Sequence, residues 1–324
     1  MHQLGAPPVV RSLADLEVAR TEQRGLVTRA QCVSAGLTSK AIEWRLRRGL
    51  WVRLHPGVYM TTPGRDDWWT TALAGQLAVP GAAWSHETAG YVWGLAPRPP
   101  RRIELVVPET RRVAPPSGVV VHRAVAADQR VDDLHWPWRT TPEETILDLS
   151  ATATPDRTFA LLGRAFQKRL TDEAAMLGRL QRRWRHPQRA LLTLVLAAAT
   201  DGVESAIEAR YRDHVERPHG LPAGVRQLRR DGGGRERHDV GYREQRVLVE
   251  LDGRLGHEGF EAQVRDGRRD RREAGSGWLT LRAFWPDVAV TPCLLATEVG
   301  AVLVDRGWRG RPRACRHPSC IVGS

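Results

Sequence analysis

The order of apolar and polar positions predicts the first folded region. Over residues 1–60, short amphipathic segments alternate with turn signals, and Thr28 and Thr38 stand where they would cap two of these segments as helices. The stretch from Trp51 to Tyr59 alternates like a β-hairpin around its Pro-Gly turn. Three helices followed by a two-stranded hairpin predict a winged helix over 1–60.

Two further folded regions follow, separated by a helical connector over 156–200. Region 61–155 predicts a small α/β domain, with helices over 68–79 and from Pro142 and strands over 102–107 and 119–123. Region 201–324 predicts helices over 203–215, 261–273 and 292–304 and strands over 225–230, 237–242, 247–252 and 278–284. The order αβββαβα is typical of a sheet covered by helices. We therefore expect an α/β multidomain protein.

Charge narrows the range of partners. The net charge is +12, which favours polyanionic partners, and Lys40 and Lys168 are the only lysines among the basic residues. Arginine suits phosphates and guanine edges, although codon bias alone would also produce an arginine-rich chain. No apolar run approaches the ~18 residues that span a bilayer, and no secretion signal is visible. We expect a cytoplasmic protein without a membrane partner.

The pair of strands over 237–252 carries the candidate chemistry. With the turn at Glu244-Gln245, Asp239 and Glu250 lie on directly opposed positions, and Asp252 shares the face of Glu250. Crowded carboxylates resist joint ionisation unless a cation neutralises them, and oxygen ligands suit Mg²⁺ or Mn²⁺. These residues predict a metal site for phosphodiester hydrolysis. The alternative is that they are solvated strand positions.

The string of Asp239, then Val-Leu-Val-Glu250-Leu-Asp252-Gly, then His257 and Asp-x-x-Arg-Asp resembles the PD-(D/E)XK nucleases. Within that superfamily, the branch related to very-short-patch-repair endonucleases is the most similar. The resemblance implies a restriction-endonuclease-like core in which Asp239 and Glu250 bind the metal. A helix glutamate, Glu204 or Glu208, often assists.

One departure from that superfamily concerns its lysine. Asp252 stands at the lysine's position, and no lysine follows Lys168. His257 is therefore the candidate for proton transfer, since a histidine titrates near neutrality. A loop histidine without a role is the alternative. The missing lysine also leaves open a domain that binds without cutting.

The N-terminal motifs Gly-Leu-Val-Thr-Arg-Ala, Gly-Leu-Thr-Ser and Pro-Gly-Val-Tyr resemble the winged helix of AbiEi-type antitoxins. The middle region continues this likeness more weakly. The resemblance implies double-stranded DNA as the partner, with a cognate toxin as a further possible partner. In a winged helix the third helix enters the major groove and the wing reaches phosphates. The candidate DNA-binding residues are Ser39, Lys40, Arg45, Arg47, Arg48 and Arg53. A helical adaptor with a basic face is the alternative.

Two other groups of reactive residues are weaker candidates. The tail residues Cys315, His317 and Cys320 offer only three ligands, so we expect no stoichiometric zinc. Ser85-His86 and the distant Asp148 contain the residue types of a catalytic triad, but we expect their combination to be chance.

The sequence thus predicts a DNA-binding protein with a Mg²⁺-dependent endonuclease activity. The alternative is a non-catalytic, antitoxin-like transcriptional regulator that keeps the nuclease fold as a binding module. RNA as the substrate stays open, as does the oligomeric state.

Overall fold

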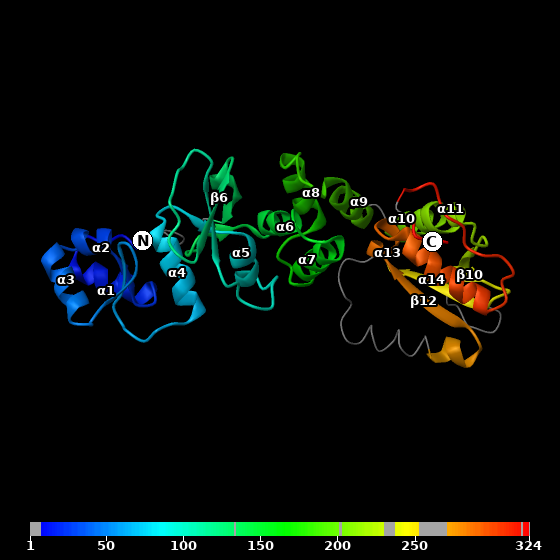
Figure 1. The fold of residues 1–324 in the computed structure, drawn as a ribbon, viewed down its shortest axis with the longest axis horizontal. Coiled ribbons are helices and arrows are strands. Elements are labelled where there is room, and N and C mark those ends of the chain that lie inside the picture. Colours follow the sequence, from blue (N-terminus) through cyan, green and yellow to red (C-terminus); the bar gives the residue numbers. More distant parts are fainter. Residues whose placement is uncertain are drawn as a thin grey trace. The chain divides into compact units, whose positions relative to one another are not determined.

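The chain forms two compact units, Met1–Leu149 and Ser150–Ser324 (Figure 1). The computed structural model describes residues 8–132, 134–200, 203–229, 237–252, 271–318 and 320–323, with the backbone alone for 198–200 and 203–206. None of the described helices is long and apolar enough to cross a membrane. Both helices and several sheets are present, so the predicted mixed α/β class is confirmed.

The first unit begins with three helices and a small antiparallel sheet. The elements are α1 (Leu13–Glu22), β1 (Leu26–Thr28), α2 (Arg29–Ser34), α3 (Ser39–Arg47), β2 (Val52–His55) and β3 (Val58–Met60). The predicted caps are confirmed: Thr28 accepts a hydrogen bond from the amide of Gln31 and Thr38 from that of Ala41, at 3.1 and 3.2 Å. The sheet order is β1-β3-β2. The predicted hairpin is therefore present, and the short β1 adds a third strand.

The rest of the first unit is built around a five-stranded sheet. The elements are α4 (Trp68–Ala78), β4 (Ala83–Trp84), α5 (His86–Val92), β5 (Ile103–Pro108), β6 (Val119–Ala124), η1 (Ala127–Arg130), β7 (Val131–Asp132), β8 (Arg139–Thr140) and α6 (Pro142–Ser150). The strand order is β6-β5-β4-β8-β7, with β5 and β6 parallel. The helix from Trp68 and the two longer strands are confirmed predictions. The two-residue strands carry too little pattern to be recognised in the sequence.

One apolar cluster joins the two parts of the first unit. Leu26, Val58 and Met60 of the small sheet belong to the same buried cluster as Trp84 and Leu105 of the large sheet. A second cluster lies under the three helices and contains Ile42 and Tyr59. Strands β1 and β3 are thus buried on both faces, once against the helices of this part and once against the five-stranded part, whereas β2 is mostly exposed.

The second unit begins with helices and continues into a four-stranded sheet. Its helices are α7 (Pro155–Gln167), α8 (Glu173–Arg182), α9 (Arg189–Thr200), α10 (Val203–Arg210), the π-helix η2 (Tyr211–Glu216), α11 (Arg217–His219), α13 (Trp285–Ala289) and α14 (Pro292–Asp305). Its strands are β9 (Val225–Leu228), β10 (His238–Tyr242), β11 (Val247–Asp252) and β12 (Leu279–Phe284). The predicted strands are confirmed. The single helix predicted over 203–215 instead changes to a π-helix after Arg210.

The sheet of the second unit has the order β12-β11-β10-β9. Its first three strands in the chain pair antiparallel, and β12 then runs parallel to β11. Helix α10 contacts β11, and helix α13 contacts β12. After α14 the chain returns as an extended tail, and Pro312 lies where a Cβ on Gly300 would be only 2.2 Å from its Cγ. Glycine at this position lets the tail lie against α14.

Candidate functional site

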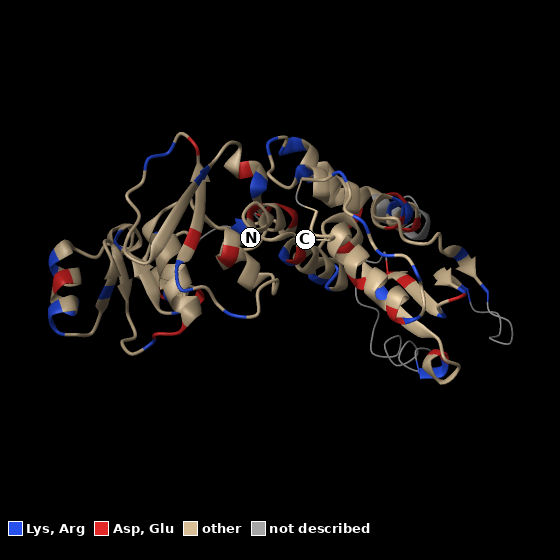
Figure 2. Cartoon of the chain, turned by 45° about the vertical axis from the view of Figure 1, so that its right-hand side comes forward, with Lys and Arg blue, Asp and Glu red and all other residues tan. Residues whose placement is uncertain are grey.

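The helix α3 and the hairpin β2–β3 form the predicted DNA-binding surface. Ile42 is the buried anchor of α3. Most of the remaining helix is exposed, and the exposed set of predicted residues is Ser39, Lys40, Arg47, Arg48 and, on β2, Arg53. Figure 2 shows basic and acidic residues mixed over both units, so the net charge of +12 is not confined to α3.

Three of the predicted DNA-binding residues have partners within the protein, and one of them is Arg48, whose guanidinium carbon lies 5.7 Å from the ring centroid of Trp44. Arg45 is half-buried, donates to the carbonyl oxygen of Ala41 at 2.9 Å and lies with its guanidinium carbon 5.3 Å from the ring centroid of Trp51. This cation–π contact ties α3 to the start of the hairpin. Ser39 accepts a hydrogen bond from Arg29 at 2.8 Å. The structure thus places Arg45 as a positioning residue, which its sequence position did not reveal.

The predicted register of the β10–β11 hairpin is confirmed. Val240 pairs with Val249 and Tyr242 with Val247, so the same ladder continued by one step sets Asp239 opposite Glu250. Asp252 is exposed at the end of β11. The backbone therefore brings these acidic positions to one end of the hairpin, as the alternation of the sequence indicates.

The side chains at that end make contacts that the sequence did not predict. One carboxylate oxygen of Asp239 accepts a hydrogen bond from the amide of Leu251 at 2.7 Å. Glu250 Oε1 lies 2.6 Å from Nδ1 of His238, whose Nε2 faces Glu273 Oε1 at 3.8 Å. His238 and Glu273 are 2% and 5% exposed, so a buried histidine stands between two carboxylates. The signal in the sequence that could have indicated this contact is His238 itself, a polar residue at the first position of a mostly apolar strand.

The remaining residues predicted for the metal site are less fully described. Glu204 lies in the first turn of α10, over 203–206, where the structure describes the backbone alone, and His257 lies outside the described residues. Glu208, the alternative helix glutamate, accepts a hydrogen bond from Gln227 of β9. In the described part of the chain, the one group of three or more ligand atoms close enough to share a metal ion lies elsewhere in this unit. Metal binding by Asp239, Glu250 and Asp252 stays a prediction.

A buried polar network fixes the other end of β10 to the π-helix. The hydroxyls of Tyr211 and Tyr242 are 3.0 Å apart, and that of Tyr242 donates to Glu216 at 2.8 Å. Arg226 completes the network by binding both oxygens of Glu216. Burial raises the pKa of both phenols, which keeps them protonated as donors. Burial opposes the charge of Arg226, but its hydrogen bond with Glu216 raises the pKa of the guanidinium overall.

The serine, histidine and aspartate of the first unit do meet, against expectation. Nδ1 of His86 is 3.0 Å from Oγ of Ser85 and 3.8 Å from Oδ2 of Asp148. Both contacts use the same ring nitrogen, whereas a catalytic triad needs the serine and the acid on opposite nitrogens. The ring of His86 also stacks on His122 at 3.7 Å between centroids. The expectation of a chance combination is therefore wrong about proximity, but the geometry is not that of a triad.

Comparison with known proteins finds one similarity, in the N-terminal part of the first unit. Residues 16–62 match the family model described as "Transcriptional regulator, AbiEi antitoxin". The matched segment runs from within α1 to just beyond β3. No curated protein matches the chain.

Proposed function

We propose that this protein is a DNA-binding transcriptional regulator that contacts duplex DNA through α3 and the β2–β3 hairpin. The observation that carries the proposal is the coincidence of two boundaries. The segment matching the antitoxin regulators, 16–62, begins in the first turn of α1 and ends two residues after β3, so it covers nearly all of α1-β1-α2-α3-β2-β3. That order corresponds to a winged helix, with α3 as the recognition helix and the hairpin as the wing.

The exposed side chains support different DNA contacts for α3 and for the hairpin. Lys40, Arg47 and Arg48 lie on or directly after α3, and Arg53 lies on the hairpin, so helix and wing each supply cations. In this arrangement α3 enters the major groove, and Arg53 contacts the phosphate backbone. Arg45 holds the helix against Trp51 and supplies no base contact. A toxin-like partner, as in the antitoxin family, is part of the same proposal.

The test of DNA binding uses the full chain and a panel of duplexes that includes the promoter of its own gene. We expect submicromolar binding that weakens steeply with salt as counterions are released. Arg47→Ala and Arg53→Ala should each weaken binding by about 3- to 10-fold and reduce the salt slope by about one. Arg112→Ala is the matched control, because Arg112 is an exposed arginine of the same unit outside 16–62. Equal losses in all three variants would show that charge alone, and not this surface, binds DNA.

We propose, as a second activity, Mg²⁺- or Mn²⁺-dependent phosphodiester cleavage at the open end of the β10–β11 hairpin, opposite its turn. The observation that favours it is the register, which sets Asp239 opposite Glu250 with Asp252 beyond. The order of the three antiparallel strands and the parallel β12 agrees with the expected nuclease core. In this proposal Asp239, Glu250 and Asp252 are the metal ligands, Glu204 assists them and His257 moves a proton.

The cleavage test compares wild type with three charge-neutral variants on plasmid, linear duplex and single-stranded RNA. Asp252→Asn is the most direct variant, because Asp252 is exposed. Glu250→Gln and Asp239→Asn complete the set, and each should reduce cleavage by at least about 100-fold. Glu244→Gln removes an exposed carboxylate at the turn of the same hairpin and should cut like wild type. A wild type that cuts nothing with any metal would leave the regulator as the whole function.

A further inference from the structure

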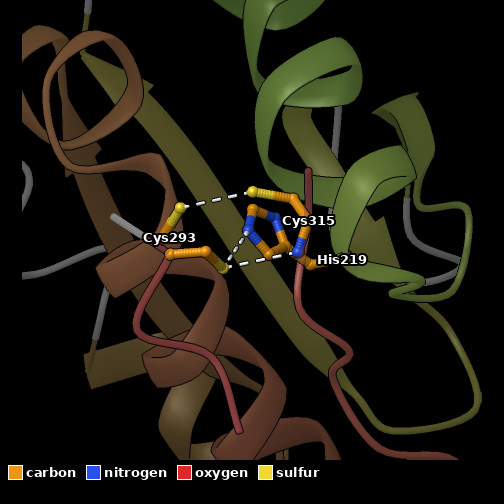
Figure 3. A group of neighbouring side chains, drawn as sticks. His219, Cys293 and Cys315 are labelled. Atoms are coloured by element: carbon orange, nitrogen blue, oxygen red, sulfur yellow. Dashed lines mark hydrogen bonds between the residues drawn. The ribbon is translucent and has the colours of Figure 1, made fainter. Parts of the chain in front are cut away.

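Three cysteines and a buried histidine meet in the second unit. The ligand atoms of His219, Cys293, Cys315 and Cys320 all lie within 4.8 Å of one another. They come from three stretches of chain: the end of α11, the first turn of α14, and the extended tail. Figure 3 shows His219, Cys293 and Cys315 turned toward one another from these stretches. The closeness of the four residues is a property of the tertiary fold.

Two of the separations between these ligand atoms are close to the edges of a zinc tetrahedron. Sγ of Cys293 and Sγ of Cys315 are 3.7 Å apart, and Sγ of Cys320 is 3.9 Å from Nε2 of His219. Zinc bonds of about 2.3 Å to sulfur and about 2.0 Å to nitrogen place two sulfurs about 3.8 Å apart and a sulfur and nitrogen about 3.5 Å apart. A disulfide needs about 2.05 Å, and all of these cysteines are free thiols.

The imidazole of His219 is held in the tautomer that a metal requires. Its Nδ1 donates a hydrogen bond to the carbonyl oxygen of Val215 at 2.9 Å. In the neutral ring this leaves the lone pair of Nε2 directed toward the sulfurs. A metal-binding histidine almost always donates its other N–H in this way. His219 is only 1% exposed, so its orientation is fixed by its surroundings.

Backbone amides point at the sulfurs from the tail itself. The amide of Cys315 donates to Sγ of Cys320 at 3.3 Å, and the amide of His317 donates to Sγ of Cys315 at 3.4 Å. Hydrogen bonds of this kind favour the thiolate, which is the form that binds metal. His317, which the spacing of the tail offered as a ligand, contributes its backbone amide to the group.

The tail is fixed on both sides of the group although it has no regular secondary structure. The amide of Arg313 donates to the carbonyl oxygen of His219 at 2.9 Å, Pro312 lies against Gly300, and Val322 is buried. The ligand positions are thus held by contacts beyond the group itself, as expected of a preformed site.

We propose that His219, Cys293, Cys315 and Cys320 bind one Zn²⁺ in a closed tetrahedral Cys₃His site that attaches the tail to the second unit. Thiolate and imidazole ligands select zinc over the oxygen-preferring Mg²⁺ and Mn²⁺. Four protein ligands leave no position for a substrate or an activated water, so the site is structural. This site is separate from the carboxylates of the β10–β11 hairpin and is independent of any cleavage.

The decisive measurement is the zinc content of the full-length protein, purified under reducing conditions without chelator or metal-affinity tag. We expect about one zinc per chain by elemental analysis. Cys293→Ser and Cys315→Ser should each lower the content at least about 10-fold. His317→Ala is the matched control and should retain full zinc, because its imidazole is outside the ligand set.

A second measurement decides the question if the cysteine variants fail to fold. Wild-type protein stripped of metal and supplied with Co²⁺ should show the intense visible bands of tetrahedral thiolate coordination, which Zn²⁺ should then displace. If reduced, zinc-free protein gives no such bands after Co²⁺ is added, the proposal is overturned. A disulfide found by mass spectrometry between Cys293 and Cys315 in freshly purified protein also overturns it, as does zinc lost from His317→Ala alone.

Discussion

Two histidines of the second unit are almost equally buried and have opposite surroundings. His238 stands between the carboxylates of Glu250 and Glu273, whereas His219 faces three sulfurs and donates its other N–H to a backbone carbonyl. Both sites contain several metal-binding residue types. In the part of the chain that the structure describes, the second brings four ligand atoms within 4.8 Å of one another, and the hydrogen bond from its Nδ1 turns the other ring nitrogen toward the sulfurs, whereas both ring nitrogens of His238 face carboxylates. The identity of nearby residues therefore says less about a metal than the hydrogen bonds that orient them.

The largest expected effect follows from removing the proposed zinc from His219, Cys293, Cys315 and Cys320. A strong zinc chelator should destabilise the second unit by several kcal/mol and lower its unfolding temperature by about 10 °C, since structural metal binding is folding free energy. Differential scanning calorimetry with and without added Zn²⁺ measures this change. Limited proteolysis should then cut within 306–323. An unchanged unfolding temperature with zinc fully removed would show that the tail is held by packing alone.

The second prediction concerns the histidine between the carboxylates. His238→Ala removes the side chain that lies between the partly buried Glu250 and the buried Glu273, and it should cost about 2–3 kcal/mol of unfolding free energy at neutral pH. Urea denaturation of the second unit measures the loss. His238→Asn, which retains a donor for Glu250, should recover part of it. The zinc content of both variants should equal that of wild type, because the two sites share no residue.

The third prediction is that Mg²⁺ or Mn²⁺ at the carboxylates exchanges rapidly, whereas Zn²⁺ at the cysteines does not. Mg²⁺ or Mn²⁺ should support cleavage, and a weak oxygen-donor chelator should abolish it within minutes without removing zinc. Parallel cleavage assays and elemental analysis on the same samples measure the two effects. Zinc loss and cleavage loss that always occur together would contradict two separate sites.

The smallest expected effect is at the far end of β10. Tyr242→Phe removes the hydroxyl between Tyr211 and Glu216 and should cost about 1–2 kcal/mol, since Arg226 still binds Glu216. Chemical denaturation measures this loss. Zinc content and DNA binding should be unchanged. A change in either would mean that the π-helix transmits strain to those surfaces.

Local sequence signals predicted much of the backbone. The caps at Thr28 and Thr38, the hairpin at Pro56 and the register around Val240 and Val249 depend on residues close in the chain. Their turn chemistry and alternation are readable without a tertiary structure.

Features that depend on distant segments could not be predicted in this way. Cys320 and His219 are 101 residues apart and meet only because the tail returns over α14. The same holds for His238 beside Glu273, and for His86 beside Asp148. The three-residue spacing in the tail therefore could not reveal this group, since His219 and Cys293 belong to other elements.

The apolar cluster of the first unit limits the transfer of its N-terminal segment to another protein. Leu26, Val58 and Met60 bury one face of the small sheet against residues beyond position 62. An excised 1–62 fragment would expose that face to water, which costs about 25 cal/mol per Å² of apolar surface. The segment that matches the regulators is thus not a portable module. A chimera that exchanges it between proteins must carry the five-stranded sheet as well, or supply another apolar surface of the same shape.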